Sequence, residues 1–365
     1  MNTRQFLFAI ATLVTLSASC MGPDTPSLQL DASSAEVGGD AGIDWPPAPD
    51  FAGIKTWLNS PPLSLAGLKG KIVVVDFWTY SCVNCIRTLP YLRTWHEAYS
   101  DLGLVIVGVH RPEFDFEKVE SNVQEALARE GITWPIALDN ESATWDAYHN
   151  RYWPRKFLID HLGRIRRDVI GEGQYAETEV WIRELLTESG VDVSQIPLGP
   201  SAGPAPVRHR ITRELYAGTR WALGNYIGNA PFSSATGFSE PDIYRDDEFY
   251  LHGDWRLTPE SAIHARETSG FDDFFSLVYR AASVNVVVAP GRALPVTLLV
   301  THADDPIPIA LRGTDVVLDD SGQTVLIVDR PRMYSVIAAA NVHTGKLRVY
   351  AKSEGLTLHT FTFGR

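Results

Sequence analysis

Two cysteines separated by two residues are the part of the chain best suited to chemistry. Cys82 and Cys85 follow an apolar run that carries a single acid, Asp76, and a run of that kind predicts a buried strand. The cysteines then open a helical pattern, where the free amides of a first helical turn stabilise a thiolate. We therefore expect Cys82 to be a nucleophile, and Cys85 to be the more buried resolving thiol within disulfide reach.

The elements that must position these residues alternate between strands and helices. Buried-strand runs occupy residues 71–78, 104–110 and 156–160. Helical patterns occupy residues 82–99, 116–130 and 177–187. This alternation predicts an α/β sheet with covering helices for residues 46–195.

Residues 211–365 have a different pattern of predicted elements. Short β-type runs are separated by Gly, Pro and Asp turns and lie at residues 275–279, 284–288, 296–300, 325–328 and 356–363. That spacing predicts an all-β sandwich. Proline and glycine crowd residues 196–210, which predicts a linker between the two regions.

The N-terminus has the composition of an export signal. Arg4 precedes an apolar run and three small residues, and Cys20 follows directly. The run is too short to span a bilayer, so residues 1–20 resemble a bacterial lipoprotein signal with Cys20 as the lipidated residue. Cleavage at a nearby small residue is the alternative, which leaves export without an anchor. Residues 21–45 are acidic and rich in Ser, Gly, Ala and Pro, and they predict a flexible tether.

Composition limits the partners of the chain. Its 32 basic and 44 acidic residues give a net charge of −12. A negative chain has no overall positive field to attract phosphate backbones, which argues against general nucleic-acid binding. Three cysteines are too few for a disulfide scaffold, so both regions must depend on apolar cores.

Four features around the cysteines occur together in one family. An acid stands six places before the first cysteine (Asp76), a proline five places after the second (Pro90), and a proline loop before a strand (Pro154). Residues 116–139 supply an extra helix and strand. The segment thus resembles thioredoxin-fold proteins of the TlpA and DipZ group. The resemblance implies that Asp76 is buried and shuttles a proton from the resolving thiol, and that Pro154 follows a cis bond beside the disulfide, as an edge for an extended substrate.

Three further side chains are candidates for positions near the site. Residues 108–114 resemble the same group and could bring His110 to the cysteines, although a histidine at a strand end is more often structural. Trp78 ends the apolar run before the cysteines, and Trp153 directly precedes the loop proline. Asp76 has an alternative too, as a strand-end acid that faces water.

Other uses of the cysteine pair fit its surroundings less well. A zinc site needs four ligands, and neither a second cysteine pair nor a His-x3-5-His pattern follows, so we expect no metal. Haem attachment would need His in place of Ile86, and a related copper chaperone would have three residues between its cysteines. A peroxiredoxin is the strongest rival, because Thr79 lies three places before Cys82, but Val75 stands where that family has proline.

The C-terminal region also resembles a module of the DipZ group, one similar to carbohydrate-binding β-sandwiches. Residues 214–218, 253–255, 313–315, 332–334 and 361–364 carry this resemblance. It implies a jelly-roll-like sandwich and leaves a carbohydrate ligand open, since aromatic side chains in a sandwich are more often core residues.

Together these features predict an extracytoplasmic thiol-disulfide oxidoreductase, lipid-anchored in the cell envelope, that reduces disulfides of exported proteins without a cofactor. Its electrons would come from a separate inner-membrane carrier of the DsbD or CcdA kind, because an exposed dithiol drifts toward the disulfide in an oxidising compartment. Two alternatives remain: a thiol-dependent peroxide reductase, and a sugar- or envelope-binding module with the thioredoxin-like domain as support. The intact pair Cys82 and Cys85, with Asp76 and Pro154, favours the enzyme.

Overall fold

The computed structural model describes residues 44–200, 210–221, 226–229, 237–291 and 294–365. The predicted export signal with Cys20, nearly all of the predicted tether and most of the predicted linker lie outside the described residues. Residues 45–365 form one compact unit, which contains two separate sheets. Within the described ranges, no helix has both the length and the apolar character needed to cross a membrane.

Strand β2 (Ile72–Trp78) shows how the sequence forms the first sheet. All seven of its residues are buried, and Asp76 is the only charged one. It pairs in parallel with β3 (Leu104–His110) and antiparallel with β5 (Arg155–Ile159). A central strand covered on both faces needs the near-continuous apolar run that the sequence has at this place.

The first sheet has six strands in the order β1-β4-β3-β2-β5-β6. The edge strands are β1 (Trp57–Leu58) and β6 (Ile165–Ile170), and β4 (Ile136–Leu138) lies between β1 and β3. Its helices are α1 (Val83–Tyr99), α2 (Glu120–Glu130), α3 (Ala143–Ala147) and α4 (Tyr175–Glu188), with single 3-10 turns at η1 (Ser100–Leu102) and η2 (Asp115–Lys118).

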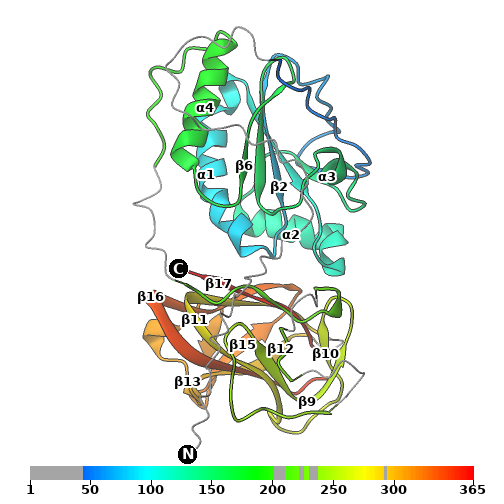
Figure 1. Cartoon of the computed structure of the whole chain (residues 1–365), viewed down its shortest axis with the longest axis vertical. Helices are drawn as coiled ribbons and strands as arrows, with labels where there is room; N and C mark the ends of the chain where they lie inside the picture. The colour runs from blue at the N-terminus through cyan, green and yellow to red at the C-terminus, as the bar shows by residue number, and fades with distance from the viewer. Residues whose placement is uncertain (1–43, 201–209, 222–225, 230–236, 292–293) are drawn as a thin grey trace, which may run out of the picture. The chain divides into compact units, whose positions relative to one another are not determined.

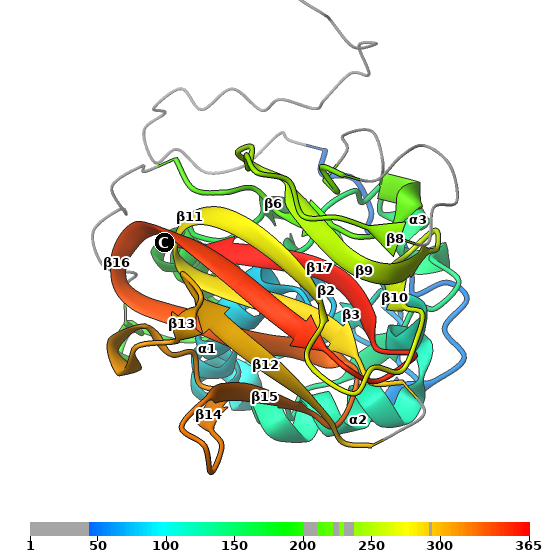
Figure 2. The ribbon, with the colours of Figure 1, turned by 90° about the horizontal axis from the view of Figure 1, so that it is seen from below.

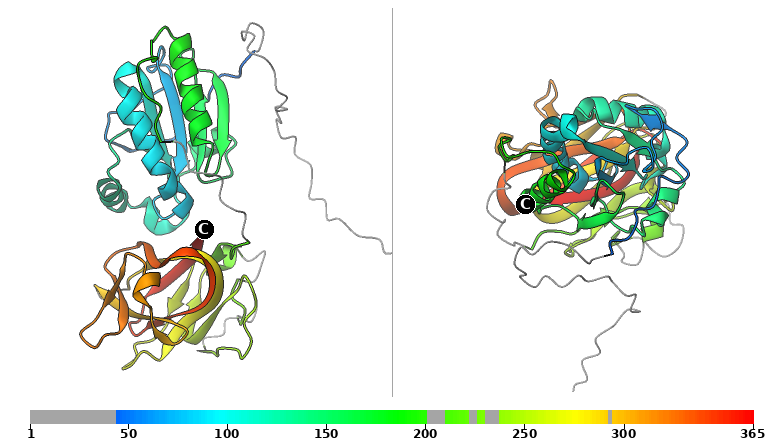
Figure 3. Two further views of the ribbon diagram at one scale, coloured as in Figure 1. Left: turned by 90° about the vertical axis from the view of Figure 1, so that its left-hand side faces the viewer. Right: turned by 90° about the horizontal axis from the view of Figure 1, so that it is seen from above.

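Side chains of α1 and α4 pack in one core, and the other face of the sheet has its own core. Leu89 of α1 and Ile182 of α4 lie in one apolar cluster with Val74. Trp145 of α3 lies in the second cluster with Val75, the next residue of β2. Figures 1 and 3 show α1 and α4 side by side along the sheet, and Figure 1 shows α3 away from them. Alternate side chains of β2 thus pack into two apolar layers, one on each face of the sheet.

The α/β prediction is confirmed, with one difference in detail. The predicted helix at residues 116–130 is divided at Val119 into η2 and α2, because Val119 has an extended backbone (φ −77°, ψ 114°). The predicted extra helix and strand correspond to α2 and β4.

The named strands of the second sheet all pair antiparallel, in the order β14-β15-β12-β16-β11-β17-β10-β9-β8, while β7 pairs with β17 and β13 with β12. Its strands are β7 (Leu215–Tyr216), β8 (Gly237–Phe238), β9 (Phe249–Leu257), β10 (Ala262–His264), β11 (Asp273–Ala289), β12 (Val296–His302), β13 (Asp305–Pro306), β14 (Val316–Leu318), β15 (Thr324–Val328), β16 (Arg332–Ala351) and β17 (Thr357–Gly364). Two 3-10 turns, η3 (Thr219–Trp221) and η4 (Ile309–Leu311), complete this domain.

Two long strands bend this sheet around an apolar core. β11 pairs with β9 along its first part and with β17 along its second part, while β16 runs along its other edge. Pairing shifts register between Ala281 and Ser283, and such bulges bend strands. Figure 2 shows β11 and β16 curving across the domain. The all-β prediction is confirmed, but the runs at residues 275–279 and 284–288 belong to one bent strand.

Candidate active site

The two cysteines lie where the chain passes from β2 into α1. Cys82 is the N-cap residue of α1, and its Sγ accepts a hydrogen bond from the backbone amide of Cys85 at 3.3 Å. Cys82 is partly exposed, Cys85 is completely buried, and both are free thiols. The outer and inner positions expected of a nucleophile and a resolving thiol are therefore occupied.

Burial governs the ionisation of both thiols. It raises the pKa of Cys82 above the ordinary value of 9.0, and the hydrogen bond from Cys85 opposes that rise. Burial also raises the pKa of Cys85 well above 9.0, and the hydrogen bond with Cys82 adds to the rise. The sequence led us to expect stabilisation of the Cys82 thiolate by the helix terminus. The contact is present, but desolvation outweighs it.

Asp76 lies on β2 with only 1% of its surface exposed. Its Oδ1 has no hydrogen-bond partner among the described residues. Burial raises the pKa of Asp76 from 3.8 to about 6, and the positive charge of Lys156 opposes the rise. Its charge in turn contributes to the raised pKa of Cys85. The buried position is the one that the family resemblance implied, and the alternative of a water-facing acid does not fit it.

Lys156 is a neighbour of Asp76 that sequence reasoning missed. The two residues are directly paired across β2 and β5, so their side chains leave the sheet on the same face. Lys156 is completely buried, and its Nζ donates to the Gly171 carbonyl at 3.3 Å. Burial lowers the pKa of Lys156, and the charges of Asp76 and Cys85 oppose this. The available signal was a lysine directly before the apolar residues Phe157, Leu158 and Ile159, because a lysine buried with them needs a partner for its charge.

The proline loop precedes β5. The peptide bond between Trp153 and Pro154 is cis, as the resemblance implied. Trp153 donates from Nε1 to the Arg111 carbonyl at 3.2 Å, and its ring lies 4.4 Å from that of Trp145. The guanidinium of Arg111 lies 5.0 Å from the Trp153 ring centre. Trp153 thus joins the proline loop to the end of β3.

His110 and Trp78 end the neighbouring strands β3 and β2 and pack against each other, with ring centres 5.4 Å apart. His110 is fully buried, and its Nε2 lies 3.2 Å from the hydroxyl of Thr79. Its ring also stacks on Tyr80 at 5.7 Å. Burial lowers the pKa of His110 to about 3, which makes it neutral at physiological pH. His110 therefore supports the residues just before the cysteines through packing and one polar contact.

Glu117, which sequence reasoning did not single out, ties the segment after β3 to the cysteine loop. Its Oε1 accepts from the Ser81 amide at 3.3 Å and from the Ser81 hydroxyl at 2.6 Å. Its Oε2 accepts from the amides of Glu113 (2.6 Å) and Phe114 (3.0 Å). One buried carboxylate thus holds both the residue before Cys82 and the end of the stretch 108–114 that the resemblance had marked.

The second domain also contributes to this region. Tyr216 of β7 donates from its hydroxyl to Oε1 of Glu113 at 2.7 Å, and the same hydroxyl lies 3.1 Å from Oε2 of Glu214. Sequence analysis marked residues 214–218 only as a sign of fold. Their partner lies more than 90 residues away, and no local pattern could have indicated the contact.

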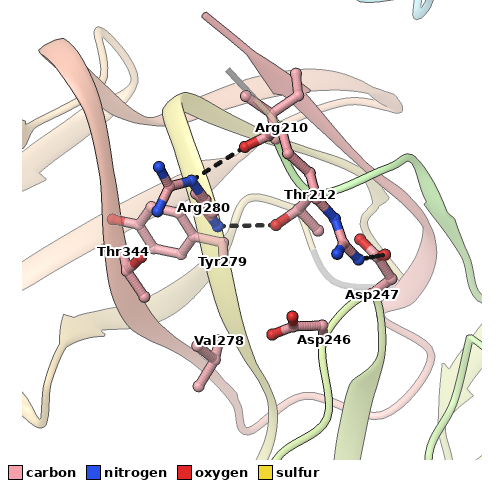
Figure 4. A pocket seen from close by; sticks show the side chains of 9 residues that line it. Arg210, Thr212, Asp246, Asp247, Val278, Tyr279, Arg280 and Thr344 are labelled. Carbon is pink, nitrogen blue, oxygen red and sulfur yellow. Dashed lines mark hydrogen bonds and ion pairs between the residues drawn. The ribbon is translucent and has the colours of Figure 1, made fainter.

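A separate pocket of about 180 Å³ lies in the second domain. Figure 4 shows its polar groups bound to one another: Arg280 donates to the Arg210 carbonyl at 3.1 Å, and Arg210 pairs with Asp247 at 3.3 Å. Aromatics that could have stacked on a sugar, such as Trp255 and Tyr334, are buried core residues. Within the described part of the chain, no three His, Cys, Asp or Glu side chains lie together as a metal site would require.

Both domains match known families. Residues 46–168 match the AhpC/TSA family, and residues 212–364 match the family described as thioredoxin like C-terminal domain. These matches agree with the thioredoxin-like α/β fold of the first domain and with its cysteine pair, and relatives of the chain are named thiol-disulfide oxidoreductases.

Three similar proteins show how much of the chain each resemblance covers. Protein DipZ of Mycobacterium tuberculosis is 37% identical over 323 residues, which are 87% of this chain and 43% of that protein. The chain therefore spans less than half the length of DipZ. The thiol-disulfide oxidoreductase YkuV of Bacillus subtilis is 29% identical over 143 residues, which are 39% of this chain and 96% of YkuV. The thiol-disulfide oxidoreductase ResA of Bacillus thuringiensis is 25% identical over 185 residues, 51% of this chain and 99% of ResA.

Proposed function

We propose that this protein is an extracytoplasmic thiol-disulfide oxidoreductase that reduces disulfides of exported proteins through Cys82 and Cys85. The observation that carries the proposal is the difference between the two sulfurs: Cys82 is partly exposed at the helix N-cap, and Cys85 is buried one turn further on. A nucleophile needs access to its substrate, whereas a resolving thiol needs access only to the nucleophile.

In the first step, the thiolate of Cys82 attacks one sulfur of a substrate disulfide. A Cys82–substrate disulfide forms, the substrate disulfide breaks, and the other substrate sulfur leaves as a thiolate that takes a proton from water. The amide of Cys85, which donates to Cys82 Sγ at 3.3 Å, stabilises the attacking thiolate.

In the second step, Cys85 loses its proton to Asp76 and attacks Cys82 Sγ. The Cys82–Cys85 disulfide forms, and the second substrate sulfur leaves, so two electrons have passed to the substrate. Asp76 suits the role of base because its pKa of about 6 lies near neutral pH, where a base both accepts and returns a proton. The cis bond before Pro154 lies at the start of β5, where an extended substrate could pair with the loop backbone.

Several finer parts of the proposal rest on sequence patterns outside the described residues. Cys20 would carry a lipid, residues 21–45 would act as a tether, and an inner-membrane carrier of the DsbD or CcdA kind would return electrons to the pair. Release of a Cys20→Ala variant from membrane fractions supports the anchor, and a soluble wild-type protein with an unmodified N-terminus contradicts it.

Insulin-disulfide reduction tests the central role of the cysteines. We expect Cys82→Ser to abolish activity and Cys85→Ser to accumulate mixed disulfides, because only the second variant can still attack. Cys20→Ser is the matched control and should keep full activity in vitro. If Cys82→Ser still reduced insulin, Cys82 could not be the nucleophile.

Peroxide reduction is the second candidate, favoured by the match to the AhpC/TSA family and by Thr79, three places before Cys82. It requires Cys82 to attack a peroxide oxygen and become a sulfenic acid, which Cys85 then condenses to a disulfide with loss of water. Thiol-dependent consumption of hydrogen peroxide, much faster than insulin reduction and lost in Cys82→Ser, would favour this function over the first.

A further inference from the structure

The contact between β7 and the segment after β3 contains an unusual proton arrangement. The hydroxyl of Tyr216 lies within hydrogen-bond distance of two carboxyl groups, Glu113 at 2.7 Å and Glu214 at 3.1 Å. A phenol has one proton and can donate it to only one of them. If both acids were ionised, the second contact would set the lone pairs of the neutral phenol oxygen against a negatively charged carboxylate oxygen. The geometry thus calls for one additional proton, shared within a unit of Glu113, Tyr216 and Glu214.

The surroundings of the two acids favour such a proton. Burial raises the pKa of Glu113 well above 4.5, and the charges of Glu214 and Glu117 raise it further. Burial also raises the pKa of Glu214, and the Tyr216 hydroxyl opposes this. Two carboxyl groups that share one site cannot easily both ionise.

The unit is fixed to the cysteine loop through hydrogen bonds. Ser81, which directly precedes Cys82, donates to Oε1 of Glu117, and the amide of Glu113 donates to Oε2 of the same carboxylate. Both acids also act on Cys82 electrostatically: after burial, the negative charges of Glu214 and Glu113 are causes of its raised pKa.

Other contacts hold this part of the second domain in place. His359 of β17 packs against the rings of Phe114 and Phe116, each with centres 4.8 Å apart. Glu260 accepts from the Asp115 amide at 3.0 Å. The position of Glu214 and Tyr216 therefore does not depend on the shared proton alone.

We propose that Glu214 and Tyr216 complete the redox site from the second domain: with Glu113 they hold one proton between two acids, and the single negative charge of this unit controls how readily Cys82 forms its thiolate. The inference deepens the proposed function and rests on Cys82 as the nucleophile. The three residues are positioning residues, because they act through the charge of Cys82. The second domain then has a role in the chemistry of the first.

Several other ionisable groups face the same region and must be kept constant in a test. They are Cys85 of α1, Asp76 of β2, Glu117 of η2, Arg111 after β3 and Arg220 of η3, which donates to the Glu113 carbonyl. Variants should therefore remove only the charges of Glu113 and Glu214.

The decisive experiment measures alkylation of Cys82 by iodoacetamide against pH in the full chain. The parent carries Cys20→Ser and Cys85→Ser, so that Cys82 is its only thiol. Three variants are made in this parent: Glu113→Gln, Glu214→Gln and the two substitutions together. Each single variant keeps one negative charge and should change the rate at pH 7 by less than about twofold. The double variant loses that charge and should react about tenfold faster, as expected for a pKa lowered by one unit.

Glu260→Gln is the control, because it removes a second-domain acid that contacts the Asp115 amide and pairs with Arg220 at 3.0 Å, while both acids of the unit and Arg220 itself stay in place; it should leave the rate unchanged. Additive acceleration by the two single variants would show that both acids are ionised and would overturn the proposal. An unchanged rate in the double variant, or equal acceleration by Glu260→Gln, would overturn it too. Circular dichroism establishes that each variant is folded.

Infrared spectroscopy tests the shared proton without reference to Cys82. At pH 8 Asp76 is ionised, since its pKa is about 6. We expect one protonated-carboxyl band in the parent that is lost in either single variant. A parent without this band contradicts the shared proton. Insulin reduction, measured separately with Cys82→Ser in the otherwise native chain, reports on the proposed function alone, so the two failures are distinguishable.

Discussion

Asp76, Cys85 and Lys156 are three ionisable residues buried near one another, and the charge of Asp76 affects the proton affinity of both of the others. Asp76 contributes to the raised pKa of Cys85, and Lys156 moderates the rise at Asp76. A negative charge is therefore easier to hold at Asp76 than at Cys85. Cys85 needs a base close by, and Asp76 has both the burial and the unpartnered oxygen for that role.

Asp76→Asn should stabilise the fold while slowing turnover. As the pH rises from about 4 to 6, the unfolded chain loses the Asp76 proton before the folded chain does, so the native protein loses stability. Above pH 6 the cost remains constant, at about 3 kcal/mol for a shift of this size. Denaturant unfolding should show Asp76→Asn more stable by up to that amount at pH 8 and equal at pH 3. Asp101→Asn, an exposed control, should show no such difference, and equal stability of Asp76→Asn at pH 8 would contradict the burial cost.

Lys156→Met should move the pH dependence of the resolution step upward. Without the positive charge paired across β2 and β5, the pKa of Asp76 rises, by about one unit for the loss of one close opposite charge. The pH at which release of a mixed disulfide from Cys82 reaches half its maximum should rise with it. Lys156→Arg keeps the charge and should restore the lower value; an unshifted profile in Lys156→Met would remove Lys156 from the mechanism.

At the level of elements, local pattern predicted most of the first domain. The run before the cysteines gave β2 to within one residue, and the run at 104–110 matches β3 in full. The pattern was weaker in the second domain. β16 has polar residues and Gly345 along much of its length, so its 20 residues did not stand out as a strand. β16 forms a strand because it pairs with β11, and the periodicity of a sequence does not show which distant segment a strand will pair with.

Gly108 illustrates a requirement of element packing that the sequence alone does not reveal. It lies on β3, opposite Asp76 of β2. A Cβ at this position would come within 2.5 Å of Ile136 and 2.9 Å of the Trp78 side chain. Gly108→Ala should therefore destabilise the protein by about 1–3 kcal/mol, as overpacked core sites do. Gly67→Ala, where the nearest atom lies at 3.4 Å, is the control in denaturant unfolding, and equal stability of the two variants would contradict the expected crowding.

For the molecule as a whole, the contact between the two domains adds residues to the proposed redox site that could not be predicted from either domain alone. Cys82, Cys85, Asp76 and Pro154 could be proposed as site residues from spacing and resemblance because they lie in one domain. Glu214 and Tyr216 were not, because their partner Glu113 becomes a neighbour only when the domains pack together. The residues of a site that is assembled from distant segments can be identified only from the three-dimensional structure.

His359 makes this contact sensitive to acid. It is buried against Phe114 and Phe116, and burial lowers its pKa from 6.5 to about 4. As the pH falls below 6.5, the unfolded chain binds a proton at this residue while the folded chain does not. The native state therefore loses stability progressively down to about pH 4, by about 3 kcal/mol in total, and no loss arises from this residue above pH 7.

His359→Gln should remove this part of the acid sensitivity. The free energy of unfolding, measured in denaturant at pH 7.5 and at pH 4.5, should fall less in the variant than in the wild type. His149→Asn is the control, because His149 is exposed with a left-handed backbone (φ 50°) that asparagine tolerates well. An identical acid-induced loss in His359→Gln and the wild type would mean that His359 is protonated in the folded protein. The packing of its ring against Phe114 and Phe116 would then not exclude water from the contact between the domains.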